Sequence, residues 1–410
     1  MKNFIVYILR ILTKRALARY KPVVVGITGS VGKTSTKEAI FTVLHRNFFV
    51  AKSDANTNNE IGVPCAVLNI EPSGTRDRHA TWQSRRRFLI GILRSIVLAY
   101  GPRRKYFPKI LILELGADKP GDMAYLSELL KPQVAVITAV GEVPAHVEFY
   151  ENPEAVAKEK ALILAYVGAG GFAALGADDP IVLAMKEKVR GPVMTFGFSP
   201  DADLRASDLA YYMQDNHIAG LSFKVHKGET FVPIRVPGLI APHQIQSILA
   251  AAAVGLHFGM NLVELGNTLE SYQAPGHRVE LLAGINGSTL LDDTYNASPL
   301  SAHAALEALH EFGTALHKRR IAVLGDMKEL GEYAKQAHEE LGQFAARKVD
   351  CLFTIGELGK LIPGAAQRFD TNATALEFLK SFIKDGDVVL IKGSHAMHML
   401  DLVDALRYKL

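Results

Sequence analysis

Residues 23–38 read VVVGITGSVGKTSTKE, a stretch that predicts a strand, a glycine-rich loop and the start of a helix. The backbone N–H groups of such a loop and the positive end of the helix dipole both favour a bound anion. We therefore expect a nucleotide phosphate site, in which Lys33 reaches the terminal phosphates and the Thr34 hydroxyl binds Mg²⁺.

The predicted phosphate contacts come from the loop and the first residues of the helix, namely Gly29, Ser30, Val31, Gly32, Lys33, Thr34 and Ser35. The usual motif places another glycine five positions before Gly32, where this chain has Ile27, preceded by Gly26. A glycine-rich turn that binds nothing is the alternative interpretation. The apolar strand before the loop and the helix after it favour the phosphate site.

The composition is that of a globular protein, with 410 residues, 49% hydrophobic and 21% charged. This length predicts two or three domains. The two cysteines are far apart and outside any CxxC pattern, which argues against a disulfide framework and a cysteine zinc site. We expect a reducing, cytoplasmic compartment.

Positive charge is concentrated in two short segments. Residues 1–21 carry six basic and no acidic side chains, and residues 75–109 carry ten basic side chains against one acid. Because the whole chain has a net charge of only +4, the remainder is acidic. We expect an anionic surface as a partner for these two segments alone, and no nucleic acid as a partner of the protein.

Both basic segments contain an apolar helical pattern. Residues 3–20 predict an amphipathic helix, and residues 88–100 are 13 residues with a single charge between two cationic clusters. The second run is too short to span a bilayer, which needs about 20 apolar residues. Each helix fits either packing on the protein or peripheral contact with the inner face of a membrane, and both alternatives stay open.

The order of strands and helices predicts an α/β fold with two main domains. Apolar strands alternate with helices after the phosphate loop, and residues 193–237 look like a smaller antiparallel excursion. We expect an N-terminal helix at 1–21, a central ATP-binding domain with a mostly parallel sheet at 22–273, and a Rossmann-like doubly wound domain at 274–410. Residues 75–109 form an insertion in the central domain.

Several polar residues follow predicted strands, where open α/β sheets build their sites. Glu114 ends the apolar run at 109–116, and His146 follows the strand that begins at residue 134. The polar turn at 56–64 includes Asn58 and Asn59, which we expect to contact substrate or phosphate. As alternatives, Glu114 is an ordinary charge at a strand end and the asparagines are structural turn residues.

The motifs together resemble the Mur ligase superfamily, and within it the MurF branch, which joins D-alanyl-D-alanine to a UDP-muramoyl-tripeptide. The matching segments are TGSVGKTSTKE (28–38), NTNNEIGVP (56–64), LELGA (113–117), the segment from Gly141 to His146, AKEKA (157–161), GHRVE (276–280), LDDTYNASPLS (291–301), VLGDMKELG (323–331) with His338, and IKGS (391–394). They occur in the family's order and cover roughly residues 22–405.

The resemblance implies a role for each matched residue. The implied catalytic residues are Lys33, Lys160, His146 and Arg278, and the implied ligands of two Mg²⁺ ions are Thr34, Glu114, His146 and a carbamylated Lys160. ATP would be contacted beside the loop by Ser247, Arg278, Asp293 and Asn296. The substrate would be contacted by Asn58, Asn59, Asn296, Ser298, Lys392 and Ser394. Lys158, two residues from Lys160, is the less favoured candidate for the carbamate. Taken singly, Lys160 also fits a solvated helix lysine and Arg278 a linker ion pair.

The implied activity is ATP-dependent amide bond formation in the synthesis of a peptidoglycan-like cell-wall precursor. ATP phosphorylates a substrate carboxylate, and an amine then attacks the acyl phosphate. The protein mainly positions the reactants and neutralises charge. The partners would be a cell-wall peptide precursor and an amino acid or dipeptide.

The chain departs from the family pattern in three places. About 20 residues precede the phosphate loop strand, which predicts that the UDP-binding domain is missing because a domain needs at least about 50. The family's H-N-x-x-N helix start is His243-Gln244-Ile245-Gln246-Ser247 here, and Ser247 offers fewer hydrogen bonds to a base than asparagine. The usual K-G-S-R ends in His395, a titratable group instead of a permanent charge.

Two other functions remain open besides a MurF-type ligase. One is a ligase acting on a lipid-linked or other non-UDP acceptor, by analogy with MurT-type relatives, whose cysteine-rich insertion is absent here. The other is a non-catalytic nucleotide-binding scaffold for cell-wall enzymes.

Overall fold

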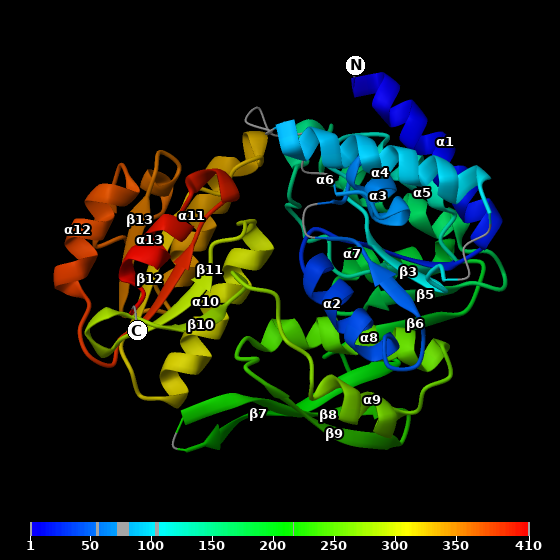
Figure 1. The fold of residues 1–410 in the computed structure, drawn as a ribbon. Helices are drawn as coiled ribbons and strands as arrows, with labels where there is room; N and C mark the ends of the chain where they lie inside the picture. Colours follow the sequence, from blue (N-terminus) through cyan, green and yellow to red (C-terminus); the bar gives the residue numbers. More distant parts are fainter. Residues whose placement is uncertain (1, 55–56, 72–81, 103–105, 216, 409–410) are drawn as a thin grey trace.

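The computed structural model describes residues 2–54, 57–71, 82–102, 106–215 and 217–408. The predicted insertion at 75–109 therefore lies partly outside the described residues. The molecule has two lobes, each built on its own sheet, with the chain passing from one to the other between residues 270 and 280 (Figure 1).

The first lobe is a nine-stranded sheet in the order β2-β3-β1-β4-β5-β6-β7-β8-β9. Its strands are β1 (Val23–Thr28), β2 (Val50–Lys52), β3 (Ile110–Glu114), β4 (Val134–Ile137), β5 (Phe172–Gly176), β6 (Val193–Gly197), β7 (Leu204–Gln214), β8 (His217–Lys227) and β9 (Thr230–Pro237). Its helices are α1 (Lys2–Tyr20), α2 (Lys33–Leu44), α3 (Gly62–Leu68), α4 (Trp82–Tyr100), α5 (Asp122–Leu130), α6 (Pro153–Ala161), α7 (Pro180–Leu183), α8 (Ile245–His257) and α9 (Leu262–Leu269).

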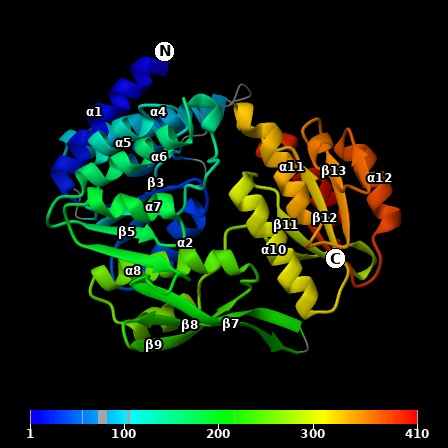
Figure 2. The ribbon, with the colours of Figure 1, turned by 180° about the vertical axis from the view of Figure 1, so that it is seen from behind.

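Helices cover both faces of the parallel part of this sheet, which explains why its strands are continuously apolar. In β1, Val25 and Ile27 point into a core shared with α2 and α8, whereas Val24 points into a core shared with α3, α5 and α6. The antiparallel strands β7, β8 and β9 extend the sheet at one edge (Figure 2). The antiparallel excursion expected at 193–237 therefore begins only at β7, because β6 at residues 193–197 pairs in parallel with β5 and β7.

The second lobe is a six-stranded sheet in the order β10-β11-β15-β12-β13-β14. Its elements are β10 (Glu280–Ala283), β11 (Thr289–Asp293), α10 (Pro299–Ala315), β12 (Arg320–Gly325), α11 (Ala334–Ala345), β13 (Cys351–Ile355), β14 (Gln367–Phe369), α12 (Asn372–Phe382), β15 (Val388–Lys392) and α13 (Leu400–Leu406). All pairs are parallel except β10 with β11. Helices α10 and α11 pack on one face, and α12 and α13 on the other.

The expected α/β fold class is confirmed, with a large, mostly parallel sheet and a second doubly wound sheet. The sheet of the second lobe includes two short strands, β10 and β14. Strands of three or four residues leave too little periodicity to be read from sequence.

Helices α1 and α4 form an outer layer on the first lobe, above α3 and α5 (Figure 1). One side of this layer is buried in a small apolar cluster that includes Leu9, Leu12, Phe88 and Leu98. Packing on the protein, one of the two open alternatives for each helix, therefore accounts for one face of α1 and of α4. Among the described residues, no helix is long and apolar enough to cross a membrane.

Two histidines, His338 on α11 of the second lobe and His243 just before α8 of the first, are held in an environment that favours the neutral ring. His338 on α11 is completely buried, accepts a hydrogen bond from the Met327 N–H (3.0 Å) and contacts the Ala334 carbonyl through Nδ1 (2.6 Å). Burial lowers the pKa of His338, and burial next to Lys392 lowers the pKa of His243 to about 4.

We expect acid to destabilise the protein through these two rings. In the unfolded chain a histidine titrates near about 6.5. Below that pH the unfolded state binds more protons than the folded state, so stability is lost as the pH falls toward about 4. Denaturant unfolding at several pH values checks this: His338→Gln should flatten the pH dependence while lowering stability at neutral pH. Equal pH slopes for the two proteins would contradict the assignment.

Candidate active site

The loop between β1 and α2 has the backbone geometry of a phosphate cradle. Gly29 (φ 148°) and Gly32 (φ 79°) adopt positive φ values. A Cβ at Gly29 would lie 2.0 Å from Thr138 Oγ1, so only glycine fits. The loop is braced from behind by the segment after β4, because Ser30 N–H donates to the Ala139 carbonyl (2.6 Å). Its N–H groups and the start of α2 thus have an arrangement that favours a bound anion.

Ile27, the residue that breaks the usual glycine motif, belongs to the strand and not to the loop. It lies within β1, opposite Glu114 of β3 and Val136 of β4, and is completely buried in the core beneath α2. The loop therefore begins at Gly29, and the side chain of Ile27 fills the core where a glycine would leave a gap.

Thr34 is the point where three elements meet. From the first turn of α2, its hydroxyl donates to Glu114 Oε2 at the end of β3 (2.9 Å). Arg278 Nη2, just before β10, donates to the same Thr34 Oγ1 (2.9 Å). A phosphate-loop hydroxyl, a strand-end carboxylate and a guanidinium from the second lobe therefore share one small volume.

Arg278 is held by contacts that do not involve the loop. Its guanidinium carbon lies 3.8 Å from the centre of the Tyr295 ring, a cation–π geometry. Gln244 Nε2 donates to its carbonyl (2.6 Å). Both neighbours, His277 (φ 61°) and Val279 (φ 52°), have left-handed backbone. For a β-branched valine that conformation is strained, and such strain persists where the surroundings enforce it, often at functional sites.

Two lysines converge on the loop. Lys33 Nζ donates to the carbonyls of Gly29 (2.8 Å) and Ser30 (3.3 Å), and Lys160 Nζ from α6 donates to Gly29 (3.3 Å). Burial lowers the pKa of both amines, and in Lys160 the nearby charge of Lys33 adds to the effect and brings the pKa to about 7. Lys160 is therefore partly neutral, and nucleophilic, near neutral pH. Lys158 is exposed.

His146 lies at the contact between the lobes. It adopts a left-handed backbone (φ 68°), and its Nδ1 lies 2.5 Å from Glu329 Oε2 of the LGDMKELG loop. Its Nε2 lies 3.7 Å from Asp118 Oδ1, four residues beyond Glu114. The charge of Asp118 also acts on Lys33 and Lys160. Asp118 thus links the histidine to the phosphate loop.

The predicted site residues of the second lobe form a buried network where the strands β11 and β15 end. Lys392 Nζ contacts Asp293 Oδ2 (2.5 Å) and the Asn296 carbonyl (2.9 Å), and only 2% of Lys392 is exposed. Ser298 caps α10, and Ser394 Oγ accepts from Lys328 N–H (2.8 Å). Direct substrate contact by Lys392 would require its ion pair with Asp293 to open.

The remaining predicted residues border the loop region. The Asn58 carbonyl accepts from Gly116 N–H (2.7 Å), just after β3, which places the polar turn beside Glu114. Asn59 Oδ1 accepts from the N–H groups of Ile61 and Gly62, and its buried Nδ2 has no hydrogen-bond partner among the described residues. Ser247 is buried behind the loop, where it accepts from Thr36 (3.2 Å), so base contact by Ser247 stays a prediction.

The structure therefore brings Lys33, Thr34, Glu114, Lys160 and Arg278 to one loop, with His146 linked to it through Asp118. Sequence reasoning missed Asp118, Gln244, Tyr295 and Glu329. The position of Asp118 after an apolar strand was a usable signal. The pairing of Glu329 with His146 carried no such signal, because the two residues lie far apart in the sequence.

The donor set fits Mg²⁺ at the loop. The Thr34 hydroxyl and the Glu114 carboxylate lie within hydrogen-bonding distance, and both are oxygen donors of the kind that Mg²⁺ prefers. Thr34 and Glu114 would hold the ion, which would supply positive charge against the phosphates. At the second predicted site the donors are the imidazole of His146 and the amine of Lys160, and an amine supplies an oxygen ligand only after carbamylation.

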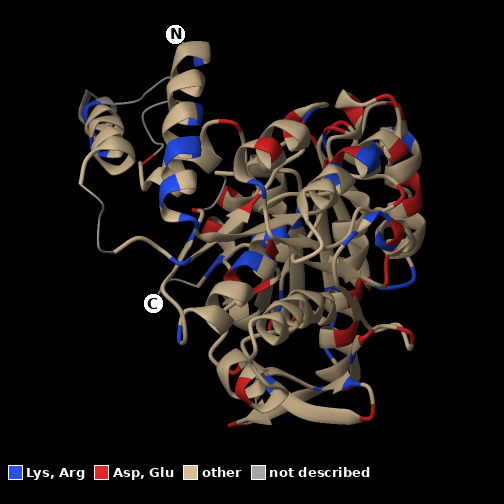
Figure 3. Ribbon diagram, turned by 90° about the vertical axis from the view of Figure 1, so that its right-hand side faces the viewer, with Lys and Arg blue, Asp and Glu red and all other residues tan. Residues whose placement is uncertain are grey.

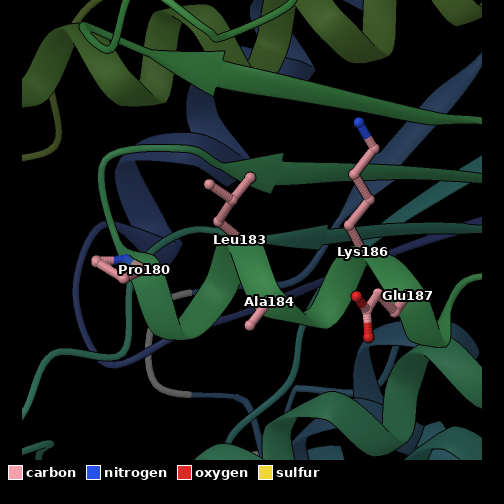
Figure 4. A pocket seen from close by; sticks show the side chains of 5 residues that line it. All are labelled: Pro180, Leu183, Ala184, Lys186 and Glu187. Atoms are coloured by element: carbon pink, nitrogen blue, oxygen red, sulfur yellow. The ribbon is translucent and has the colours of Figure 1, made fainter.

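A shallow depression of about 550 Å³ lies elsewhere, beside α7 (Figure 4). It is lined by Pro180, Leu183, Ala184, Lys186 and Glu187. None of these residues belongs to the predicted site.

Known proteins share both lobes. The Mur ligase middle domain family matches residues 27–76 and 104–255, and the Mur ligase glutamate ligase domain family matches residues 277–395. The UDP-N-acetylmuramoyl-tripeptide–D-alanyl-D-alanine ligase of Bacillus subtilis (strain 168) is 29% identical over 408 residues, covering 96% of this chain and 78% of the relative. The enzyme of the same name from Mycobacterium tuberculosis (strain H37Rv) is 31% identical, covering 93% and 72%.

Among solved structures, the MurF ligase of Thermotoga maritima in complex with ADP superposes with a TM-score of 0.79 at 26% identity, covering 98% of this chain and 83% of that one. Matches to both families, in the order of the two lobes, agree with the phosphate loop and the convergent Thr34, Glu114 and Arg278. The chain belongs to the Mur ligase family of ATP-dependent ligases, whose MurF members act in peptidoglycan synthesis.

Proposed function

We propose that this protein is a MurF-type ligase that joins a cell-wall peptide precursor to an amino acid or dipeptide at the expense of ATP. The observation that carries the proposal is the shared contact of Arg278 and Glu114 with the Thr34 hydroxyl. This contact joins the phosphate loop of the first lobe to the Arg278 guanidinium of the second lobe. Residues 22–273 and 274–410 would then act as two domains around one reaction centre.

The reaction begins with phosphorylation of the precursor. A carboxylate oxygen attacks the γ-phosphorus of ATP, the bond to the β,γ-bridging oxygen breaks, and an acyl phosphate and ADP result. Lys33 and Arg278 would contact the transferring phosphoryl group and offset its charge. A Mg²⁺ ion held by Thr34 and Glu114 would supply further charge neutralisation.

Amide formation follows at the acyl carbon. The amine of the incoming substrate attacks, loses a proton and expels phosphate, so that an amide, ADP and phosphate are the products. Because the chain supplies no covalent intermediate, its contribution is to hold the two substrates together and exclude water. Asn58 and Asn59 beside β3, and Asn296, Ser298, Lys392 and Ser394 on the second lobe, are the proposed substrate contacts.

The nucleotide would extend from the loop toward the second lobe, with Ser247 near the base and Asp293 and Asn296 near the ribose. The acceptor is either UDP-linked or lipid-linked. We expect the reaction to take place in the cytoplasm, where ATP is available. A lipid-linked acceptor would bring it to the inner face of the membrane.

We also propose that Lys160 works as a carbamate and, with His146, holds a second Mg²⁺. Its neutral amine adds to carbon dioxide and releases a proton, which converts a cation into an anionic oxygen ligand. Burial beside Lys33 supports this because it lowers the pKa of Lys160 to about 7. The uncharged amine that reacts is therefore populated at neutral pH and lost on acidification.

Turnover should depend on Lys33. With ATP, Mg²⁺, an amine substrate and a UDP-linked or lipid-linked peptide, the protein should release ADP, and Lys33→Ala should weaken ATP binding and reduce ADP release by at least about a hundredfold. The acceptor that supports turnover identifies the substrate class. A protein that binds ATP yet releases no ADP with either acceptor would instead be the non-catalytic scaffold.

Arg278 should act mainly on the chemical step. Arg278→Ala should lower kcat for ADP release by roughly 10²–10³-fold, as for other preorganised donors to developing charge. Arg278→Lys should recover only part, because an ammonium cannot reproduce the fork that reaches Thr34 and stacks on Tyr295. The control is Arg235→Ala, an exposed arginine on β9. Equal losses in both alanine variants would refute the role.

The carbamate can be tested apart from activity. Isotope-labelled bicarbonate should give a carbamate resonance in the native protein, weaker below pH about 7, where the Lys160 amine is protonated. Lys160→Arg should abolish the resonance and ligase turnover together, whereas Lys158→Arg on the same helix should keep both. A resonance that survives in Lys160→Arg would place the modification elsewhere.

A further inference from the structure

The outer helix α4 is apolar on the face that it turns to solvent. Its buried side carries Phe88, Ser95, Leu98 and Ala99. The opposite side carries six exposed large apolar residues, namely Leu89, Ile90, Leu93, Ile96, Val97 and Tyr100. Leu93 and Leu89 are 64% and 61% exposed. A surface helix of a globular protein normally turns a polar face outward, so this second apolar stripe needs a covering partner.

Helix α1 continues the stripe. Phe4, Tyr7 and Ile11 are exposed and fall on one helical face at spacings of three and four residues. The two helices meet at their C-terminal ends, where the Arg15 guanidinium carbon lies 5.4 Å from the centre of the Tyr100 ring. We call these nine apolar residues of α1 and α4 the α1–α4 face. In Figure 3, α1 and α4 lie together at one edge of the molecule.

Basic side chains border the α1–α4 face, and on α1 three of them pair with acids of neighbouring elements, namely Lys2 with Glu60, and Arg10 and Lys14 with Glu128. On α4, Arg86, Arg87 and Arg94 are exposed beside the apolar stripe, and neither α1 nor α4 contains an acidic residue. Arg87 lies 3.6 Å from Glu71, a surface pair with both partners more than half exposed, and such a pair contributes little. Apolar side chains rimmed by arginines are the pattern of a helix lying in the interface of an anionic membrane.

We propose that the α1–α4 face binds the surface of a membrane containing anionic lipids, with α4 lying in the interface plane. A second copy of this chain fits the face less well, because a symmetric pairing would bring like-charged arginine rims together. This inference goes beyond the ligase reaction and does not depend on it. Combined with that proposed function, it would place the ligase where a lipid-linked acceptor is found.

Vesicle flotation of the full chain tests the proposal. The protein should float with vesicles of phosphatidylcholine and phosphatidylglycerol at low salt, and much less with phosphatidylcholine alone. Salt should weaken binding, since the screening length falls from about 10 Å at 0.1 M to about 3 Å at 1 M. Arg86→Glu with Arg94→Glu should weaken the partition coefficient by at least about tenfold, because each basic residue near an anionic surface contributes about a fivefold factor.

Leu93→Glu should also abolish flotation, and Val263→Glu is its matched control, because Val263 on α9 is 59% exposed and lies outside the α1–α4 face. Unchanged circular dichroism and ADP release in solution would show that both variants fold and would keep this test separate from the ligase proposal. Equal binding by the two variants, or no flotation of the native protein, would overturn the inference. A Leu93-dependent dimer without vesicle binding would assign the face to a second copy.

Discussion

The hydroxyl of Thr34 links the two lobes at the reaction centre. It is placed by the glycine loop, donates to Glu114 and receives a hydrogen bond from Arg278, each at 2.9 Å. Arg278 can reach it only because Gln244, Tyr295 and two residues of left-handed backbone fix the start of β10. A phosphate held by the loop would meet the same guanidinium, so the nucleotide itself would draw the lobes together.

The buried lysines at the phosphate loop lie among other charged groups. Lys33 lies close enough to Lys160 to disfavour protonation of the Lys160 amine, while Asp118 supplies opposing charge to both lysines and Glu114 supplies it to Lys33. An isolated buried ammonium is costly, and the protein offsets that cost with loop carbonyls and carboxylates instead of complete burial in an apolar core. The same arrangement leaves Lys160 with a partly neutral amine, which is the requirement for carbamylation.

The features of the site that lie within one segment can be predicted from sequence, whereas contacts between distant segments cannot. The phosphate loop, Glu114 and the alternating strands follow from glycine placement, apolar runs and residues at strand ends. The pairing of His146 with Glu329 and of Lys392 with Asp293 depends on how distant segments fold together, and no sequence period encodes it. Each of the two alternatives for residues 88–100 corresponds to one face of α4, because one face packs on the protein and the other is exposed and apolar.

The central claim is that the two lobes assemble one centre that transfers the γ-phosphoryl group of ATP to a carboxylate. Its most direct test is the fate of a precursor whose carboxylate carries oxygen-18. The account predicts that one labelled oxygen appears in the released phosphate, because that oxygen bridges carbon and phosphorus in the acyl phosphate. Amide formation with unlabelled phosphate would contradict it.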